Sequence, residues 1–291
     1  MGISVIHYSL HGDFQGGDCY MSRKVKIGMI QLQSKLGDVK HNVNHAIDKI
    51  KEAAEQGAQI ICLPELFATG YDLTQLKEEI IDMSAKNYEY IKDEMSRAAK
   101  EHGVYLIAPF GEVRDEPGIV YNSALFFDDE GELLGSFAKS HLWALDRLYF
   151  REGTDYPVFD TKYGKVGILI CYDAGFPEAS RVLMTKGAEL VFYPSAWRVE
   201  DEDIWDLNMR QRALENVYFS VGVNSYDPSE TTKLFGKSKI CNPRGKVLEE
   251  LPKNEEAMSV FEIDMDEVQS QRNDISYLRD RKPHHYTAIV Q

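Results

Sequence analysis

Three polar residues lie where apolar strands give way to loops, and their types suit one shared reaction. Glu65 ends the segment IICLPE, Lys139 ends LLGSFAK, and Cys171 lies within VGILICYD. Strand ends in layered α/β proteins hold side chains rigidly beside loops that shape a pocket, so ligands bind there. A thiol, a carboxylate and an ammonium group that meet in such a pocket can carry out nucleophilic catalysis.

The three groups would divide that chemistry between them. A free thiol, with a pKa of about 8.5, is a weak nucleophile until a neighbouring base or cation raises its thiolate fraction. Glu65 would take the thiol proton and later activate water. Lys139 would stay protonated and stabilise the oxyanion of a tetrahedral intermediate, together with backbone N–H groups at Cys171 and Tyr172. Each well-placed donor of this kind is worth about 3–4 kcal/mol.

Each residue also has an ordinary interpretation. A glutamate after proline commonly caps a helix or charges a loop, a lysine is commonly solvated, and a cysteine in an apolar strand commonly fills the core. The joint occurrence of the three residues, each in a distinctive local sequence, favours the catalytic interpretation.

Composition narrows the class of protein. The chain has 291 residues, of which 43% are hydrophobic and 27% charged, and its net charge is −14. This acidity disfavours nucleic acid and anionic membranes as partners, since both require clustered Lys and Arg. No apolar run approaches the about 18 residues of a membrane span. The cysteines show no CxxC pair or metal-ligand spacing, which suits a reducing, cytoplasmic setting better than disulfides or zinc: Cys19, Cys62, Cys171 and Cys241.

The periodicity of apolar residues predicts strands that alternate with helices. The predicted strands are 24–33, 58–65, 104–112, 165–173, 189–197 and 219–226, and 231–265 is strand-rich. The predicted helices are 39–57, 88–102, a segment after Pro177, and 204–218. A hairpin over 121–142, with a turn at 128–131, interrupts the alternation. This mixture predicts two packed mixed sheets with helices outside, in one domain.

The regular pattern starts only near Met21. Residues 1–22 lack a basic start and a continuous apolar stretch, so we expect a leader or loose arm there rather than a secretory signal. Residues 23–291 then form a single domain that ends in a tail from Arg279 to Gln291, rich in aromatic and basic residues.

With these motifs in view, the chain resembles the nitrilase superfamily, the carbon–nitrogen hydrolases. The resemblance runs from about Lys24 to Tyr286, with motifs in the family's order and at compatible spacing. The matching segments are LPELFATGYD, GSFAKSHLW and GILICYDAGFPE, supported by YNSALFFDDEGELL, YPSAW with the later RALEN, and YLRDRKPHHY.

The resemblance implies a fold, a mechanism and an assembly. The fold is an α/β four-layer α-β-β-α sandwich, and two subunits commonly pack into a homodimer. Glu65 is the general base, Lys139 stabilises the oxyanion and Cys171 is the nucleophile. The reaction forms a thioester acyl-enzyme, releases ammonia or an amine, and hydrolyses the intermediate with water. No metal or organic cofactor is expected.

Two further acids are candidates for an auxiliary role. Many family members carry a second catalytic-site glutamate seven or eight residues after the lysine, where this chain has Asp146, with Glu152 further on. An aspartate is one methylene shorter, so Asp146 either still positions the lysine or substrate or is a solvated loop acid. Glu112 ends another strand, and a structural ion pair is the preferred interpretation for it.

The residues around the cysteine bear on the substrate. Nitrile-cleaving members typically have Cys-Trp-Glu, whereas Cys171-Tyr172-Asp173 resembles the amidase, ω-amidase and carbamoylase branches. No arginine follows the cysteine closely as a carboxylate clamp. Arg198 could substitute for one, although pairing with Glu200 or Asp201 is favoured.

Several aromatic residues could line an apolar pocket over the acyl group: Tyr71, Tyr172 and Trp197. Core packing is the alternative for each. If the acidic run 200–203 rims that pocket it would favour neutral or cationic amides, whereas a solvated loop is the simpler interpretation.

The leading hypothesis is thus a hydrolase of small linear amides or ureido compounds. The alternatives are a nitrilase, which converts a nitrile to an acid, and a catalytically silent scaffold of the same fold. We expect a small-molecule substrate, neither nucleic acid nor membrane as a partner, and a homodimer or higher oligomer, with the tail either crossing the subunit interface or packed on its own subunit.

Overall fold

The computed structural model describes residues 23–114 and 116–290. The predicted leader or arm over residues 1–22 lies outside the described residues. Within the described part of the chain, none of the helices is long and apolar enough to cross a membrane.

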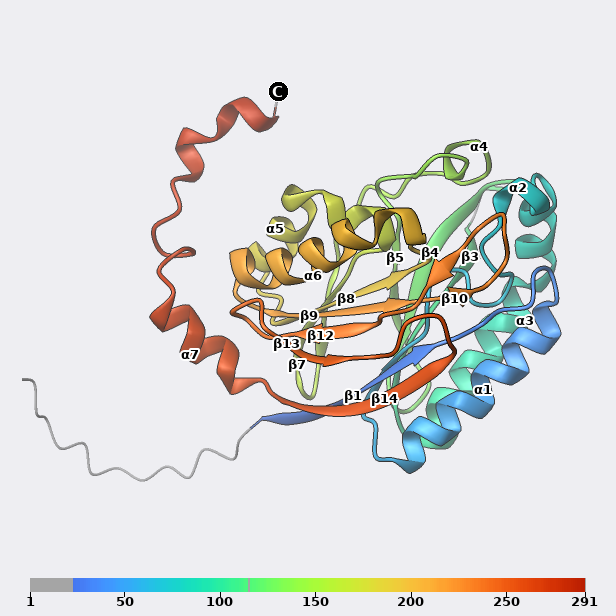
Figure 1. Ribbon diagram of the computed structural model, residues 1–291, viewed down its shortest axis with the longest axis horizontal. Coiled ribbons are helices and arrows are strands. Elements are labelled where there is room, and N and C mark those ends of the chain that lie inside the picture. The colour runs from blue at the N-terminus through green and yellow to red at the C-terminus, as the bar shows by residue number, and fades with distance from the viewer. Residues whose placement is uncertain (1–22, 115, 291) are drawn as a thin grey trace, which may run out of the picture.

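Two six-stranded mixed sheets form the centre of the molecule (Figure 1). The strands of the first sheet, in spatial order, are β14 (Ala257–Asp264), β1 (Lys24–Gln31), β2 (Ile60–Cys62), β3 (Tyr105–Val113), β4 (Val120–Phe127) and β5 (Leu133–Ala138). Those of the second are β13 (Val247–Glu250), β12 (Lys239–Cys241), β9 (Phe219–Asn224), β8 (Leu190–Ser195), β7 (Gly164–Ile168) and β6 (Val158–Thr161). A separate short pair joins β10 (Tyr226–Asp227) to β11 (Leu234–Phe235).

Each large sheet has a parallel centre and antiparallel edges. In the first, β1, β2 and β3 are parallel; in the second, β7, β8 and β9 are. The β4–β5 hairpin turns at Gly131, whose φ of +80° lies in the left-handed region that favours glycine, as the predicted turn requires. Parallel neighbours need crossover connections, which place helices over the sheet faces.

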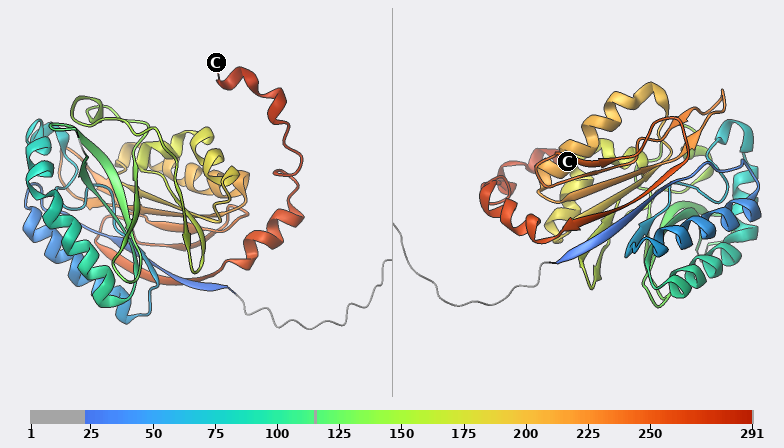
Figure 2. Two further views of the ribbon diagram at one scale, coloured as in Figure 1. Left: turned by 180° about the vertical axis from the view of Figure 1, so that it is seen from behind. Right: turned by 60° about the horizontal axis from the view of Figure 1, so that its bottom comes forward.

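Helices cover the outer face of each sheet. On the first sheet lie α1 (Val39–Glu55) and α3 (Glu79–His102), and on the second α5 (Pro177–Thr185) and α6 (Glu202–Asn216), as Figures 1 and 2 show. The inner faces of the two sheets pack on each other through buried aliphatic and aromatic side chains, among them Ile27, Ile168 and Val221. The predicted four-layer α-β-β-α sandwich is confirmed.

Most of the predicted elements are present. The helix predicted over 39–57 begins after the N-cap Asp38, whose carboxylate accepts a hydrogen bond from the His41 N–H, and it ends at Glu55. By contrast, α3 begins at Glu79 rather than at residue 88. The prediction missed its first turns because Ser84, a polar residue, occupies a buried position and interrupts the apolar period.

Some elements were not predicted. The helix α7 (Asp266–Asp274) has Val268 as its only buried residue, so it carries no apolar stripe. The short helices α2 (Leu73–Leu76) and α4 (Asp146–Tyr149) and the edge strand β6 were also missed. Beyond α7 the chain leads away from the two sheets and contains two single 3-10 turns, Pro283–His285 and Thr287–Val290 (Figure 1).

Candidate active site

Lys139 lies at the centre of a buried polar cluster. It directly follows β5, and its side chain has 0% exposure. Its Nζ donates hydrogen bonds to Glu65 Oε1 and to Asp146 Oδ2, both at 2.7 Å. Burial alone would lower the pKa of Lys139, but the two carboxylates outweigh this effect and hold the pKa well above its usual value. Lys139 is therefore a fixed cation in a dry site.

Glu65 is held in place by three hydrogen bonds. Besides the bond from Lys139, its Oε1 accepts one from Asn122 Nδ2 and its Oε2 one from the Ala196 backbone N–H, both at 2.8 Å. Burial raises the pKa of this carboxyl, while the Lys139 ammonium lowers it and the charge of Asp146 raises it further. A raised carboxyl pKa brings a general base closer to neutral pH, where it both takes up and returns protons.

Asp146 is buried beside the lysine and is not a solvated loop acid. It opens the short helix α4, where its carboxylate accepts hydrogen bonds from Lys139, from the Tyr71 hydroxyl at 2.8 Å and from the Trp143 backbone N–H at 3.2 Å. The shorter aspartate therefore still contacts the lysine directly.

Cys171 lies at a sharp turn after β7. The predicted strand over 165–173 ends at Ile168, and Cys171 opens a 3-10 helix with a φ of +49°, a left-handed conformation that is strained for a non-glycine residue. Burial raises the pKa of its thiol well above the usual value, and the charge of Glu65 raises it further. The Lys139 ammonium and the Ala196 N–H lower it. The thiol thus lies close enough to Glu65 and Lys139 for their charges to act on it.

Asp173 ties the lysine-bearing segment to the cysteine-bearing one. Its buried carboxylate accepts hydrogen bonds from the backbone N–H of His141 at 2.9 Å and from that of Ile170 at 3.1 Å. It also bonds to the His141 ring at 2.7 Å, and that ring stacks on Phe176. Because His141 is two residues from Lys139 and Ile170 adjoins Cys171, one side chain fixes the relative position of both segments.

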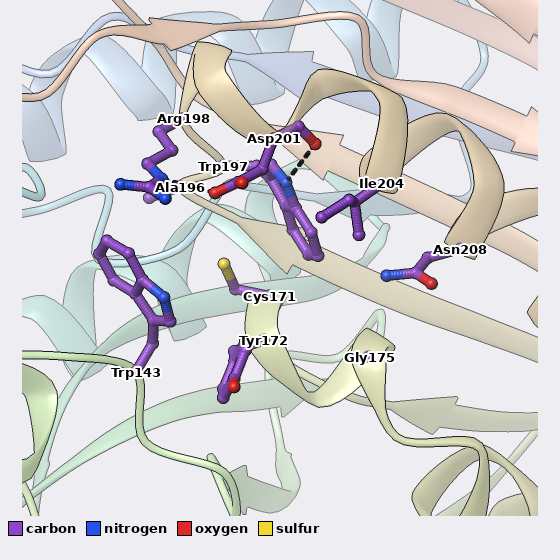
Figure 3. Close-up of a pocket in the computed structure, with 10 residues that line it drawn as sticks. All are labelled: Trp143, Cys171, Tyr172, Gly175, Ala196, Trp197, Arg198, Asp201, Ile204 and Asn208. Carbon is purple, nitrogen blue, oxygen red and sulfur yellow. Dashed lines mark hydrogen bonds and ion pairs between the residues drawn. The ribbon is translucent and has the colours of Figure 1, made fainter.

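A cavity of about 230 Å³ opens over the thiol. Figure 3 shows the Cys171 sulfur pointing into the space between the indole rings of Trp143 and Trp197, with Tyr172 below. Trp197 is fixed by hydrogen bonds to Asn224 and Asp201. A small uncharged group attached to the reacting carbon would fit between these aromatic walls.

The other predicted residues have different surroundings. Tyr71 lines a neighbouring hollow, and its hydroxyl contacts Asp146. Glu112 lies on β3 and forms an ion pair with Arg114 at 2.9 Å, in line with the structural interpretation. Arg198 forms an ion pair with Asp201, one of the two partners that the sequence favoured.

Sequence reasoning gave no role to Asn122, to the Ala196 N–H or to Trp143. For Asn122 a signal existed, since it is a polar residue within the apolar strand segment VYNSALFF. The contact made by the Ala196 N–H depends on the backbone path after β8, which residue types do not reveal.

Two sheets covered by helices, with a thiol, a carboxylate and an ammonium group gathered at their strand ends, are the arrangement expected of a cysteine-dependent hydrolase. The model of the carbon–nitrogen hydrolase family matches residues 26–273, and the chain belongs to this family. It is accordingly an enzyme that hydrolyses non-peptide carbon–nitrogen bonds.

Relatives and a solved structure agree with this placement. The chain is 32% identical to the probable nitrilase C965.09 of Schizosaccharomyces pombe, over 92% of this chain and 99% of that protein. It is 33% identical to N-carbamoylputrescine amidase of Arabidopsis thaliana, over 92% of this chain and 96% of that protein. The structure of a mutant amidase from Nesterenkonia sp. AN1 matches with a TM-score of 0.81 and 26% identity, over 92% of this chain and 97% of that one. That amidase carries an acetamide moiety added covalently at its active-site cysteine.

Proposed function

We propose that this protein hydrolyses a small linear amide or ureido compound through a thioester on Cys171. One observation carries the proposal. The Lys139 ammonium, fully buried, lies 2.7 Å from Glu65 and within electrostatic reach of a thiol that faces a small cavity. These are the groups that a cysteine-dependent acyl transfer requires.

The chemistry follows from the arrangement. Glu65 takes the Cys171 proton as the sulfur attacks the carbonyl carbon, and the oxygen becomes an oxyanion that Lys139 and the Tyr172 N–H stabilise. The protonated Glu65 then gives its proton to the leaving nitrogen, which departs as ammonia or an amine. Water attacks the thioester carbon while Glu65 takes a proton from it. The C–S bond then breaks, Glu65 returns that proton to the departing sulfur, and the acid product leaves. Asp146 and Tyr71 hold Lys139 in place by a hydrogen-bonded chain.

An amide and a nitrile of equal length separate the two enzymatic hypotheses. We expect ammonia from butanamide and none above the blank from butanenitrile, because Tyr172-Asp173 follows the cysteine where nitrile-cleaving enzymes have Trp-Glu. The measurement is ammonia release at equal concentrations of the two compounds. Ammonia from the nitrile alone would favour the nitrilase. Failure of a broad amide panel, with a Cys171 thiol that iodoacetamide does not alkylate, would favour the silent scaffold.

The link made by Asp173 gives a second expected result. In Asp173→Asn the amide offers one oxygen, so either His141 or Ile170 loses its acceptor, and Lys139 and Cys171 become less well aligned. We expect kcat to fall by at least about tenfold with a smaller change in KM, because a misplacement of about 1 Å costs up to about a hundredfold.

The rate at which iodoacetamide alkylates Cys171 is the readout that separates alignment from general stability. Glu189→Gln is the matched control. It removes a carboxylate that pairs with Arg23 and does not line the cavity over Cys171. An unchanged kcat and alkylation rate in Asp173→Asn would rule out the positioning role.

A homodimer in the cytoplasm remains our proposal for assembly and location. Tyr277 and Tyr286 in the C-terminal region are 59% and 45% exposed, as expected of a segment that packs against a second subunit.

A further inference from the structure

The charged side chains that line the cavity over Cys171 form an ion pair with each other. Of its lining residues, all within the described part of the chain, Arg198 and Asp201 are the charged ones, and they bond to each other. Trp143, Tyr172 and Trp197 supply the aromatic surface. Figure 3 shows Arg198 and Asp201 on the side of the cavity opposite Tyr172.

The ion pair is held by further contacts. The Arg198 guanidinium lies over the Trp143 ring, 5.2 Å from its centroid. The Asp201 backbone carbonyl accepts the hydrogen bond from Trp197 Nε1 at 2.9 Å. The Arg198 guanidinium is therefore held against Trp143 and the Asp201 backbone against Trp197, and the two charges neutralise each other. Reorienting either side chain to meet a substrate charge would break their ion pair.

The wall also has an uncharged polar group without a partner. Asn208 lines the cavity from α6, and its side-chain nitrogen has no hydrogen-bond partner. A neutral donor of this kind accommodates a hydroxyl or carbonyl oxygen, and it does not compensate a desolvated ionic charge.

From these contacts we infer that the Arg198–Asp201 pair selects amides with an uncharged acyl chain. Removing either partner then shifts the preference toward acyl chains whose charge is opposite to that of the remaining partner. This inference rests on the proposed amide hydrolysis. An anionic chain would meet an arginine already occupied by Asp201, and a cationic chain would meet an aspartate already occupied by Arg198. An uncharged chain loses no hydration of an ionic group when it enters the cavity.

The test uses three amides of matched length: butanamide, which is neutral, succinamate, which is anionic, and 4-aminobutanamide, which is cationic. The wild-type protein should show a kcat/KM for butanamide at least about tenfold above the other two. Asp201→Asn frees the arginine and should raise the ratio of succinamate to butanamide by about tenfold, while Arg198→Met frees the aspartate and should raise the ratio for 4-aminobutanamide. Because the Arg198 side chain is 44% exposed, added salt should weaken both shifts.

Asp203→Asn is the matched control. Asp203 lies in the first turn of α6, is exposed, and does not line the cavity, so the same loss of charge should leave all three ratios unchanged. Ratios that stay at wild-type values in both Asp201→Asn and Arg198→Met, while ammonia is still released, would overturn the inference and leave the proposed function standing.

A binding measurement keeps the two proposals separate. Calorimetric titration of the three amides into Cys171→Ala reports the charge preference without turnover, and the same order of affinities is expected. If the wild-type protein released no ammonia from any amide, the proposed function would fail. An order of affinities that does not change with Asp201→Asn or Arg198→Met in the Cys171→Ala background would then overturn the selectivity on its own.

Discussion

Replacement of Cys171 by alanine is expected to abolish ammonia release while the protein keeps its fold. The reacting bond forms at the sulfur, so no neighbouring group can take over the first step. The thiol is small, and its partners Glu65 and Ala196 N–H also bond to each other, so the free energy of unfolding should fall by about 1 kcal/mol or less. Steady-state ammonia release, circular dichroism and a urea titration measure these effects.

The other buried cysteines provide the control. Burial also raises the pKa of Cys62 well above its usual value and that of Cys241 to about 11, and neither thiol lines the cavity. Cys241→Ala should therefore retain activity. In the wild-type protein, mass spectrometry should find Cys171 alkylated by iodoacetamide ahead of Cys62 and Cys241, because of these three described cysteines Cys171 is the one that lies beside Lys139 at a cavity. Full activity of Cys171→Ala would overturn the thioester mechanism.

The architecture was largely predictable because it depends on apolar periodicity. The strands of the parallel centres and the β4–β5 hairpin follow runs of apolar residues between turn signals, and all were predicted from that pattern. Helix α7 was not, since it buries only Val268 and its position is set by tertiary contacts such as the hydrogen bond from Arg272 to the Ala188 carbonyl. A polar helix gives no periodic signal to detect.

The surroundings of the catalytic candidates were less predictable. Residue types identified Glu65, Lys139 and Cys171, but the number and direction of their hydrogen bonds depend on loops. Asp146 illustrates the difference. Its approach to Lys139 depends on the Tyr71 hydroxyl and the Trp143 N–H, which lie on separate loops. One methylene in a side chain can be compensated by backbone position, and no pattern in a single sequence reports that compensation.

Tyr71 shows what contacts a residue type leaves unpredicted. The prediction that Tyr71 lines the acyl pocket stays a prediction. The structure adds that its hydroxyl donates a hydrogen bond to Asp146 and that its ring centroid lies 5.8 Å from Lys139 Nζ. A buried tyrosine needs a partner for its hydroxyl. In this site that requirement directs the Tyr71 hydroxyl to Asp146, while Trp143 and Trp197 line the cavity over Cys171.

Replacement of Lys139 by methionine is expected to lower both activity and stability. Loss of the ammonium removes the charged donor for the oxyanion, so kcat should fall at least about a hundredfold. It also leaves Glu65 and Asp146 as two buried carboxylates without their cation. Removing one member of a buried ion pair costs about 3–5 kcal/mol, which a urea titration at pH 7 should show as a loss of unfolding free energy.

The pH dependence of this stability tests the electrostatic cause. Burial already raises the pKa of Glu65 above its ordinary value of 4.5, and without Lys139 it must rise further. In the pH range between the ordinary and the raised pKa, the folded variant binds a proton that the unfolded chain has released. The unfolding free energy of Lys139→Met should therefore fall as pH rises above about 4.5, and should partly recover when pH is lowered from 7 toward 5.

A second buried lysine separates the loss of catalysis from the loss of a buried charge. Lys239 has a side-chain exposure of 1% and also pairs with two carboxylates, Asp206 and Glu250, but it lies outside the cavity lining. Those carboxylates are 39% and 38% exposed and can be hydrated, so Lys239→Met should lose less stability than Lys139→Met and should keep its activity. If Lys139→Met kept wild-type kcat, the ammonium would have no catalytic role, and if its stability did not respond to pH, the ammonium would lack the electrostatic role that its two carboxylate contacts support.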